Sequence, residues 1–92
     1  MFGRPIYDID RKVILITGGA QGIGFAVAQQ LHARGAQVAL VDVNADALAE
    51  AKASFDSERV LTCTGDVRDR ERMGAIVDQV VAHFGRLDVV VA

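Results

Sequence analysis

The chain has 92 residues, of which 51% are hydrophobic, and a formal net charge of −2 at pH 7. This length suits one small domain or part of one, and the interspersed charges argue against a nucleic acid or an anionic membrane as the partner. The sequence has a single cysteine and no basic-then-apolar leader, and no apolar run approaches the roughly 18 residues of a membrane span. These features predict a cytoplasmic protein.

Residues 1–12 contain the only proline, Pro5, together with mixed charges. We expect an extended lead-in with no function of its own. Tyr7 precedes the first predicted strand, and its side chain is expected to pack or to face solvent.

Residues 13–24 predict a strand, a tight turn and the start of a helix, in that order. The uninterrupted apolar and β-branched residues 13–17 indicate a strand that is buried on both faces. Gly18 permits the sharp turn, Gly22 leaves room for a phosphate beside the backbone, and Gly24 allows the helix to pack close to the sheet. The N–H groups that start this helix would face the same point, so the stretch predicts an anion site, most naturally for a dinucleotide pyrophosphate.

This stretch resembles the T-G-x-x-x-G-I-G signature of the short-chain dehydrogenase/reductase family. The matching positions are Thr17, Gly18, Gly22, Ile23 and Gly24, with Gln21 directly before the second motif glycine. The resemblance implies a Rossmann-type α/β fold in which these residues bind a nicotinamide dinucleotide. The stretch is not a P-loop, because no Lys-Ser or Lys-Thr follows it. The alternative is a glycine-rich turn that binds nothing.

A helix is predicted over residues 23–34, with Ile23, Val27 and Leu31 as its apolar stripe. His32 lies in its last turn, where a partly positive imidazole favours the helix carbonyls. A metal-binding or catalytic role for this histidine would need a partner at a suitable spacing, and none is visible.

Residues 37–43 predict a second buried strand, and Asp42 stands at its carboxyl end. Dinucleotide-binding folds place an acid there for the ribose hydroxyls of the adenosine. An ionised Asp42 would repel a 2′-phosphate at about 4 Å by roughly 4 kcal/mol before screening. Family members that prefer NADP carry Arg or Lys where this chain has Gln21 and Val43, so the resemblance implies NAD rather than NADP. The alternative is that Asp42 caps the next helix, although Asn44 could do so equally well.

The remaining pattern predicts a surface helix over residues 44–57, a strand over 59–64, a helix over 68–84 and a buried strand over 87–92. The first of these helices has an apolar seam of Leu48, Ala51, Lys52 and Phe55. The second has a longer seam of Met73, Ile76, Val77, Val80 and Phe84. Cys63 is expected to be a small core residue, and His83 a favourable charge at a helix end.

Asp66 and Val67 follow the third predicted strand directly. By resemblance to the family, the carboxylate would meet the exocyclic amine of adenine, and the valine side chain would lie on the adenine ring. A helix cap is the alternative reading of Asp66.

The βαβαβαβ order of four strands and three helices predicts one parallel sheet, with strand order 3-2-1-4 by analogy with doubly wound folds. The first two helices would cover one face and the third helix the other, and the fourth strand would be an open edge. The resemblance implies that the chain, residues 1–92, is the amino-terminal part of a dinucleotide-binding Rossmann domain.

The resemblance also implies an oxidoreductase whose complete form, expected to be a homo-oligomer, transfers a hydride between NAD and an alcohol or carbonyl substrate. The family's catalytic Ser and Tyr-x-x-x-Lys have no match, since Arg11 stands four residues after Tyr7. We therefore expect this stretch alone to bind NAD(H) weakly, through the adenosine end, without turnover and without a metal site. The alternatives are a stand-alone nucleotide-binding or regulatory module and a methyltransferase, whose glycine turn differs.

Overall fold

The structure is a computed structural model that describes residues 9–55 and 57–92. Its elements alternate along the chain as β1 (Val13–Thr17), α1 (Gly22–Ala33), β2 (Gln37–Asp42), α2 (Ala45–Phe55), β3 (Val60–Thr64), α3 (Arg70–Phe84) and β4 (Val89–Val91). This is the predicted βαβαβαβ order. Tyr7 and most of the predicted lead-in lie outside the described residues.

The end of the lead-in is not extended, contrary to the prediction. Residues 10 and 11 form a turn, in which Arg11 has a φ of 66°. The Arg11 N–H donates to the Gly35 carbonyl at 2.9 Å, and the Gln37 N–H donates to the Lys12 carbonyl at 2.8 Å. The chain is therefore held against the start of β2 before β1 begins.

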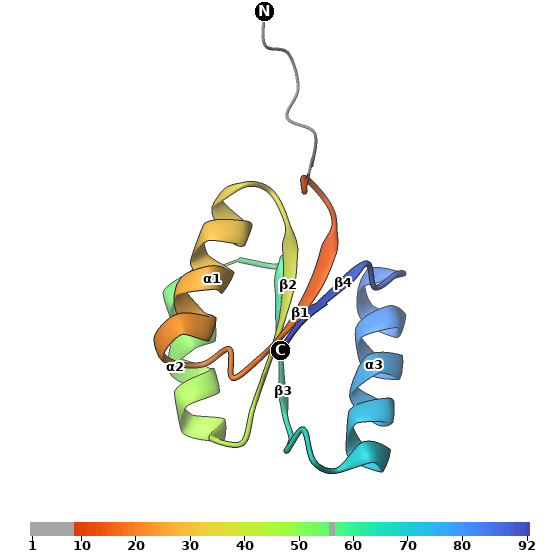
Figure 1. The fold of residues 1–92 in the computed structure, drawn as a ribbon. Helices are drawn as coiled ribbons and strands as arrows, with labels where there is room; N and C mark the ends of the chain where they lie inside the picture. The colour runs from red at the N-terminus through yellow and green to blue at the C-terminus, as the bar shows by residue number, and fades with distance from the viewer. Residues whose placement is uncertain (1–8, 56) are drawn as a thin grey trace, which may run out of the picture.

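The four strands form one sheet in the order β3-β2-β1-β4, and every pair is parallel. Helices α1 and α2 lie on one side of the sheet and α3 lies on the other (Figure 1). The segments that follow β1, β2 and β3 all leave the sheet at one edge, the lower edge in Figure 1. Parallel pairing therefore brings the predicted nucleotide-binding residues to one edge of the fold.

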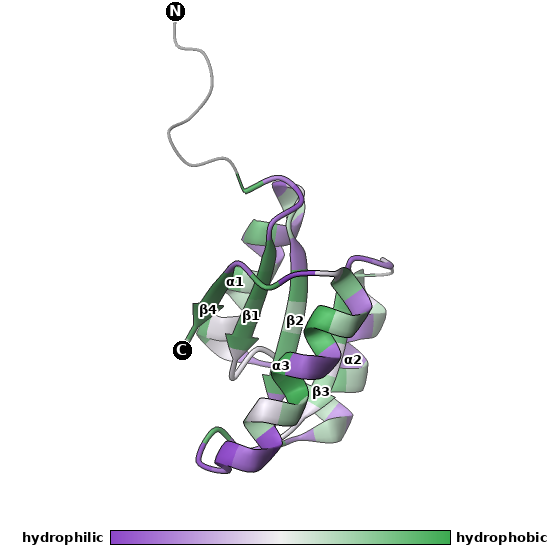
Figure 2. Ribbon diagram, turned by 90° about the vertical axis from the view of Figure 1, so that its right-hand side faces the viewer, coloured by the Kyte–Doolittle hydropathy of each residue, from purple (hydrophilic) through white to green (hydrophobic). Residues whose placement is uncertain are grey.

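The core has two layers, because successive side chains of a strand point to opposite faces of the sheet. Ile14 and Ile16 pack with the helices on one side, whereas Val13 and Leu15 pack with α3 on the other. All four of these β1 side chains are buried, as the uninterrupted apolar run predicts. Figure 2 shows hydrophobic colour along β1 and a mixture of hydrophobic and hydrophilic residues on α3.

The predicted helix seams are confirmed in α3 and only partly in the other two helices. In α3, Ile76 and Val80 are fully buried. In α1, Ile23 is 85% exposed instead of starting the apolar stripe, and Phe25 packs against the core with Val27 and Leu31. In α2, the predicted seam residue Lys52 is exposed, and Ala47, which was not predicted, is buried beside Leu48.

The charge at the end of α1 comes from Arg59, directly before β3 (Val60–Thr64), and the prediction for His32 is wrong. Burial, with a smaller effect from the Arg59 guanidinium, lowers the pKa of His32 from its ordinary value near 6.5. Its ring packs on Phe55 with 4.9 Å between ring centres. Arg59 Nη1 donates to the carbonyls of His32 at 3.1 Å and Ala36 at 2.8 Å. The cation that stabilises this helix end is therefore Arg59, directly before β3.

Strand β4 forms one edge of the sheet, as predicted, and it is shorter than residues 87–92. Val89 and Val90 are 46% and 55% exposed. The Asp88 N–H donates to the Val13 carbonyl at 2.9 Å, and the Asp88 Oδ2 accepts from the Val13 N–H at 2.8 Å. The Asp88 carboxylate thus takes the place of a backbone acceptor where the pairing of β1 with β4 begins.

Candidate nucleotide-binding site

The glycine-rich turn between β1 and α1 is built by close backbone approach. Gly18 and Gly22 have positive φ values of 65° and 60°, which favour glycine. A Cβ at Gly24 would collide with the Gly18 carbonyl. Gly24 therefore lets the helix pack against the turn itself, whereas the sequence predicted close packing on the sheet.

Gly19 contributes to this turn in a way that the sequence analysis missed. A Cβ at Gly19 would lie 3.0 Å from the Ile16 carbonyl and 3.1 Å from Leu40 Cδ2. The Gly19 N–H donates to the Val41 carbonyl at 3.2 Å. The turn is therefore attached to β2 as well as to β1, and the contact with β2 leaves no signal in the local sequence.

The first turn of α1 presents backbone donors to solvent. Gln21 is the N-cap residue and its side chain makes no capping hydrogen bond. The first helical hydrogen bond runs from the Phe25 N–H to the Gln21 carbonyl at 3.3 Å, so the N–H groups of Gly22 and Ile23 precede the helical ladder. A Cβ at Gly22 would have no heavy atom within 4 Å. Open space beside free N–H groups fits an anionic group such as a diphosphate.

Asp42 lies against the glycine turn. Its Oδ2 accepts a hydrogen bond from the Ala20 N–H at 3.3 Å, and its Oδ1 accepts from the Asn44 N–H at 3.3 Å. Asn44 Oδ1 accepts from the Ala47 N–H at 3.0 Å and so caps α2. Asn44, and not Asp42, therefore caps α2. The Asp42 carboxylate instead connects the segments that follow β1 and β2 through its two hydrogen bonds.

Asp66 forms an ion pair within its own turn. Arg68 Nη2 lies 2.7 Å from Asp66 Oδ2. Hydrogen bonds from the Arg68 side chain and backbone lower the pKa of Asp66 to about 2. The helix-cap alternative does not apply to Asp66, because Asp69 is the N-cap of α3 and accepts from the Arg72 N–H. This helix therefore begins at Arg70, two residues later than predicted.

Exposed apolar side chains lie beyond the ends of three neighbouring strands. Ile23, Val43 and Val67 are 85%, 66% and 56% exposed. Each follows the carboxyl end of β1, β2 or β3 within a few residues. Thr17, at the end of β1, donates from Oγ1 to the Val91 carbonyl at 3.4 Å. This edge therefore offers apolar surface, free N–H groups and two carboxylates, a combination that suits a nucleotide.

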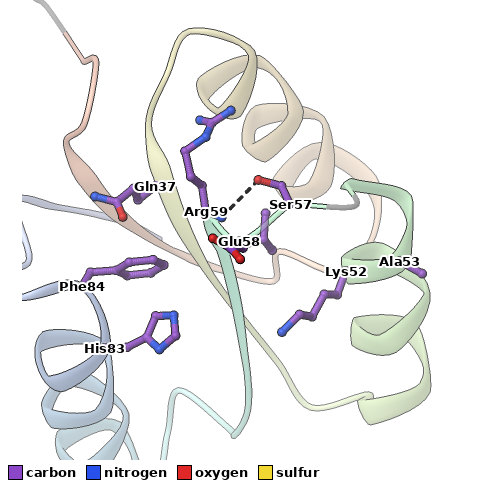
Figure 3. A pocket seen from close by; sticks show the side chains of 9 residues that line it. Gln37, Lys52, Ala53, Ser57, Glu58, Arg59, His83 and Phe84 are labelled. Carbon is purple, nitrogen blue, oxygen red and sulfur yellow. Dashed lines mark hydrogen bonds between the residues drawn. The ribbon is translucent and has the colours of Figure 1, made fainter.

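A hollow of about 850 Å³ lies elsewhere, and none of the predicted site residues lines it. It lies beside the start of β3, between α2 and the end of α3, with Lys52, Arg59 and His83 among its lining residues (Figure 3). Cys63 is buried, and this burial raises the pKa of its thiol, which disfavours a reactive thiolate. Among residues 9–55 and 57–92, no helix is long and apolar enough to cross a bilayer, and no group of three His, Cys, Asp or Glu side chains converges.

Comparison with known proteins decides the family. The family model described as short chain dehydrogenase matches residues 12–92. The chain belongs to the short-chain dehydrogenase family. It is 44% identical over 87 residues to 15-hydroxyprostaglandin dehydrogenase (NAD(+)) from Homo sapiens, covering 90% of the chain and 33% of that protein. It is 43% identical over 89 residues to levodione reductase from Leifsonia aquatica, covering 91% of the chain and 33% of that protein.

Solved structures of this family share the fold. A short chain dehydrogenase/reductase from Burkholderia phymatum, in complex with NAD, superposes with a TM-score of 0.86 at 28% identity and covers 92% of the chain and 31% of that protein. A putative short-chain dehydrogenase from Novosphingobium aromaticivorans superposes with a TM-score of 0.83 at 31% identity, over 92% of the chain and 32% of that protein. The chain thus has the predicted Rossmann-type fold, and it spans about a third of the length of the relatives it matches.

Proposed function

We propose that this short-chain dehydrogenase chain is the NAD(H)-binding portion of an oxidoreductase. The observation that carries the proposal is the hydrogen bond of 3.3 Å from the Ala20 N–H to Asp42 Oδ2. It puts an acid beside the turn whose free N–H groups suit a diphosphate, so one ligand with a diphosphate next to a ribose can contact both. The short-chain dehydrogenase/reductase in complex with NAD supports this proposal.

In this proposal different residues bind the diphosphate, the adenosine ribose and the adenine of the cofactor. The diphosphate lies over the turn and is held by backbone at Gly18, Gly22 and Ile23, with Thr17, Gln21 and Gly24 shaping the turn. The adenosine ribose meets Asp42, and Gln21 and Val43 stand where family members that prefer NADP carry a basic residue for the 2′-phosphate. The adenine lies against Asp66 and Val67. NAD, when bound, supplies the hydride acceptor, and the chain's own residues bind and orient it.

The activity belongs to a longer chain in this proposal. Relatives of about three times this length carry the names of dehydrogenases and reductases, which supports hydride transfer between NAD and an alcohol or carbonyl. The one tyrosine of the sequence, Tyr7, is not followed by Lys at the family spacing, so these residues alone are expected to bind without turnover. A cytosolic location and a homo-oligomeric complete form remain predictions from the sequence.

Titration of the isotope-labelled chain with NAD, NADP and S-adenosylmethionine tests the proposal. We expect NAD to shift the amide signals of residues 18–24 and of Asp42, with NADP binding more weakly and S-adenosylmethionine causing no change. A response to S-adenosylmethionine alone would reject NAD(H) as the ligand of this site. No response to any of the three would reject the nucleotide site.

A further inference from the structure

Arg68 holds the carboxylate of Asp66 with three donors. The Arg68 Nε lies 3.1 Å from Oδ1, Nη2 lies 2.7 Å from Oδ2, and the backbone N–H of Arg68 lies 2.9 Å from Oδ1. A guanidinium makes this planar fork and a lysine ammonium cannot. The orientation of the Asp66 carboxylate is therefore fixed by the residue two positions later.

This arrangement leaves one acceptor place on Asp66. An ionised carboxylate offers about four lone-pair positions, two on each oxygen. The backbone N–H of Arg68 donates to Oδ1 and Nη2 donates to Oδ2, while the single N–H of Nε is shared between Oδ1 at 3.1 Å and Oδ2 at 3.2 Å. Arg68 also lowers the pKa of Asp66 to about 2. At neutral pH the carboxylate is therefore ionised and can only accept hydrogen bonds. Three hydrogens of Arg68 thus meet four lone pairs, and one further N–H can bind at Oδ2, whose only unshared donor is Nη2.

The ion pair is open to solvent at the carboxyl edge of the sheet. The side chains of Arg68 and Asp66 are 87% and 36% exposed, and the residue between them, Val67, is 56% exposed. Exposed ion pairs add little to stability. The pair therefore contributes mainly by orienting Asp66, next to an apolar side chain that a flat ring can cover.

We propose that Arg68 is a positioning residue that presents Asp66 Oδ2 to an exocyclic amine, so that this subsite selects a 6-aminopurine over a 6-oxopurine. The inference rests on the proposed function, because it assumes that the base lies at Asp66 and Val67. A 6-amino group supplies the one N–H that Oδ2 can still accept. A 6-oxo group brings a second acceptor to the same place, with no proton between the two oxygens.

The experiment compares NAD with nicotinamide hypoxanthine dinucleotide, which differs at position 6 of the purine. Dissociation constants are measured by titration for the unmodified chain, Arg68→Lys and Arg70→Ala. Arg68→Lys keeps the positive charge and loses the fork, so we expect the preference for NAD to fall about fivefold, the value of one hydrogen bond. Arg70→Ala is the matched control: the Arg70 side chain is exposed at the start of α3 and has no hydrogen bond to another described residue, so the preference should persist.

Each outcome decides between the two levels of the proposal. If Arg68→Lys retains the preference for NAD, the role of Arg68 is overturned and the nucleotide site is kept. The same conclusion follows if the unmodified chain binds both dinucleotides with equal affinity. Absence of binding by the unmodified chain rejects the proposed function and this inference with it. A second readout needs no ligand: carboxyl NMR should show the pKa of Asp66 rising more in Arg68→Lys than in Arg70→Ala.

Discussion

The Asp42 carboxylate accepts a hydrogen bond from the backbone N–H of Ala20, with 3.3 Å between Oδ2 and the nitrogen. These residues lie at the end of β2 and inside the turn that follows β1. The acid proposed to meet the ribose therefore also restrains the turn proposed to meet the diphosphate. Changes at Asp42 should consequently alter both cofactor selection and the mobility of the turn.

Removing the Asp42 carboxylate should reduce discrimination between the two nicotinamide dinucleotides. We expect Asp42→Ala and Asp42→Asn to narrow the ratio of NADP to NAD dissociation constants by about tenfold, because the charge that repels a 2′-phosphate is gone. The ratio is measured by titration with each dinucleotide. Asp46→Ala removes an exposed acid from the first turn of α2 and serves as the charge-matched control. An unchanged ratio in both Asp42 variants would reject the assignment.

The same pair of variants separates charge from geometry. The asparagine side chain keeps an oxygen that can accept from the Ala20 N–H, whereas alanine does not. Amide hydrogen exchange in residues 18–24 should therefore be faster in Asp42→Ala than in Asp42→Asn. Equal exchange rates in the two variants would show that the hydrogen bond does not restrain the turn.

Gly24→Ala should destabilise the fold by about 2 kcal/mol, in the range of overpacked positions. The added Cβ would meet the Gly18 carbonyl, a backbone atom that cannot rotate away. Urea denaturation followed by circular dichroism measures the loss. Gly74→Ala is the control, since a Cβ there has no heavy atom within 4 Å, and helix propensity predicts a gain of about 1 kcal/mol. A neutral Gly24→Ala would contradict the close approach of α1 to the turn.

Arg59→Met should lower the free energy of unfolding by about 1–3 kcal/mol. The variant removes the Arg59 donor from the carbonyls of His32 and Ala36 near the end of α1, and the His32 carbonyl keeps the Gly35 N–H. The neighbouring Glu58→Ala changes an exposed side chain that has no hydrogen bond to another described residue, and should be nearly neutral. The comparison is made by urea denaturation, and equal stability of the two variants would contradict the role of Arg59.

His32 should make the protein less stable as the pH falls. Burial lowers the folded-state pKa below the ordinary value near 6.5, so the unfolded chain binds the proton first. Stability from the neutral ring is complete above about pH 7 and is lost as the pH falls through 6.5 toward the folded-state pKa. The groups that face this ring are the Arg59 guanidinium and the Phe55 ring, neither of which can accept its proton.

His32→Phe should therefore flatten the change in unfolding free energy between pH 7.5 and 5.5. Phenylalanine keeps a flat ring against Phe55 and removes the titrating nitrogen, of which Nε2 is buried without a partner among the described residues. His83→Gln removes the exposed histidine at the end of α3 and should retain the slope. Denaturation of each variant at several pH values measures how its unfolding free energy depends on pH. An unchanged pH dependence in His32→Phe would contradict the prediction.

Local sequence determined the elements of this protein and the family to which it belongs. The apolar runs at residues 13–16 and 38–41 favour burial on both faces, and this pattern predicted central parallel strands. The glycines of residues 17–24 predicted the turn, since positive φ and close backbone approach exclude most side chains. The alternation of strands and helices then left the doubly wound sheet as the consistent topology.

Only the tertiary structure decided which groups meet. Ala20 donates to Asp42, and Arg59 supplies the helix-end charge expected of His32, because pairing of β1 with β2 and of β2 with β3 brings distant segments together. Ile23 is exposed, and Phe25 packs against the core with Val27 and Leu31, a choice that the helical period alone did not make. A sequence pattern records what each residue favours locally, whereas burial, charge pairing and pKa depend on neighbours that only the fold supplies.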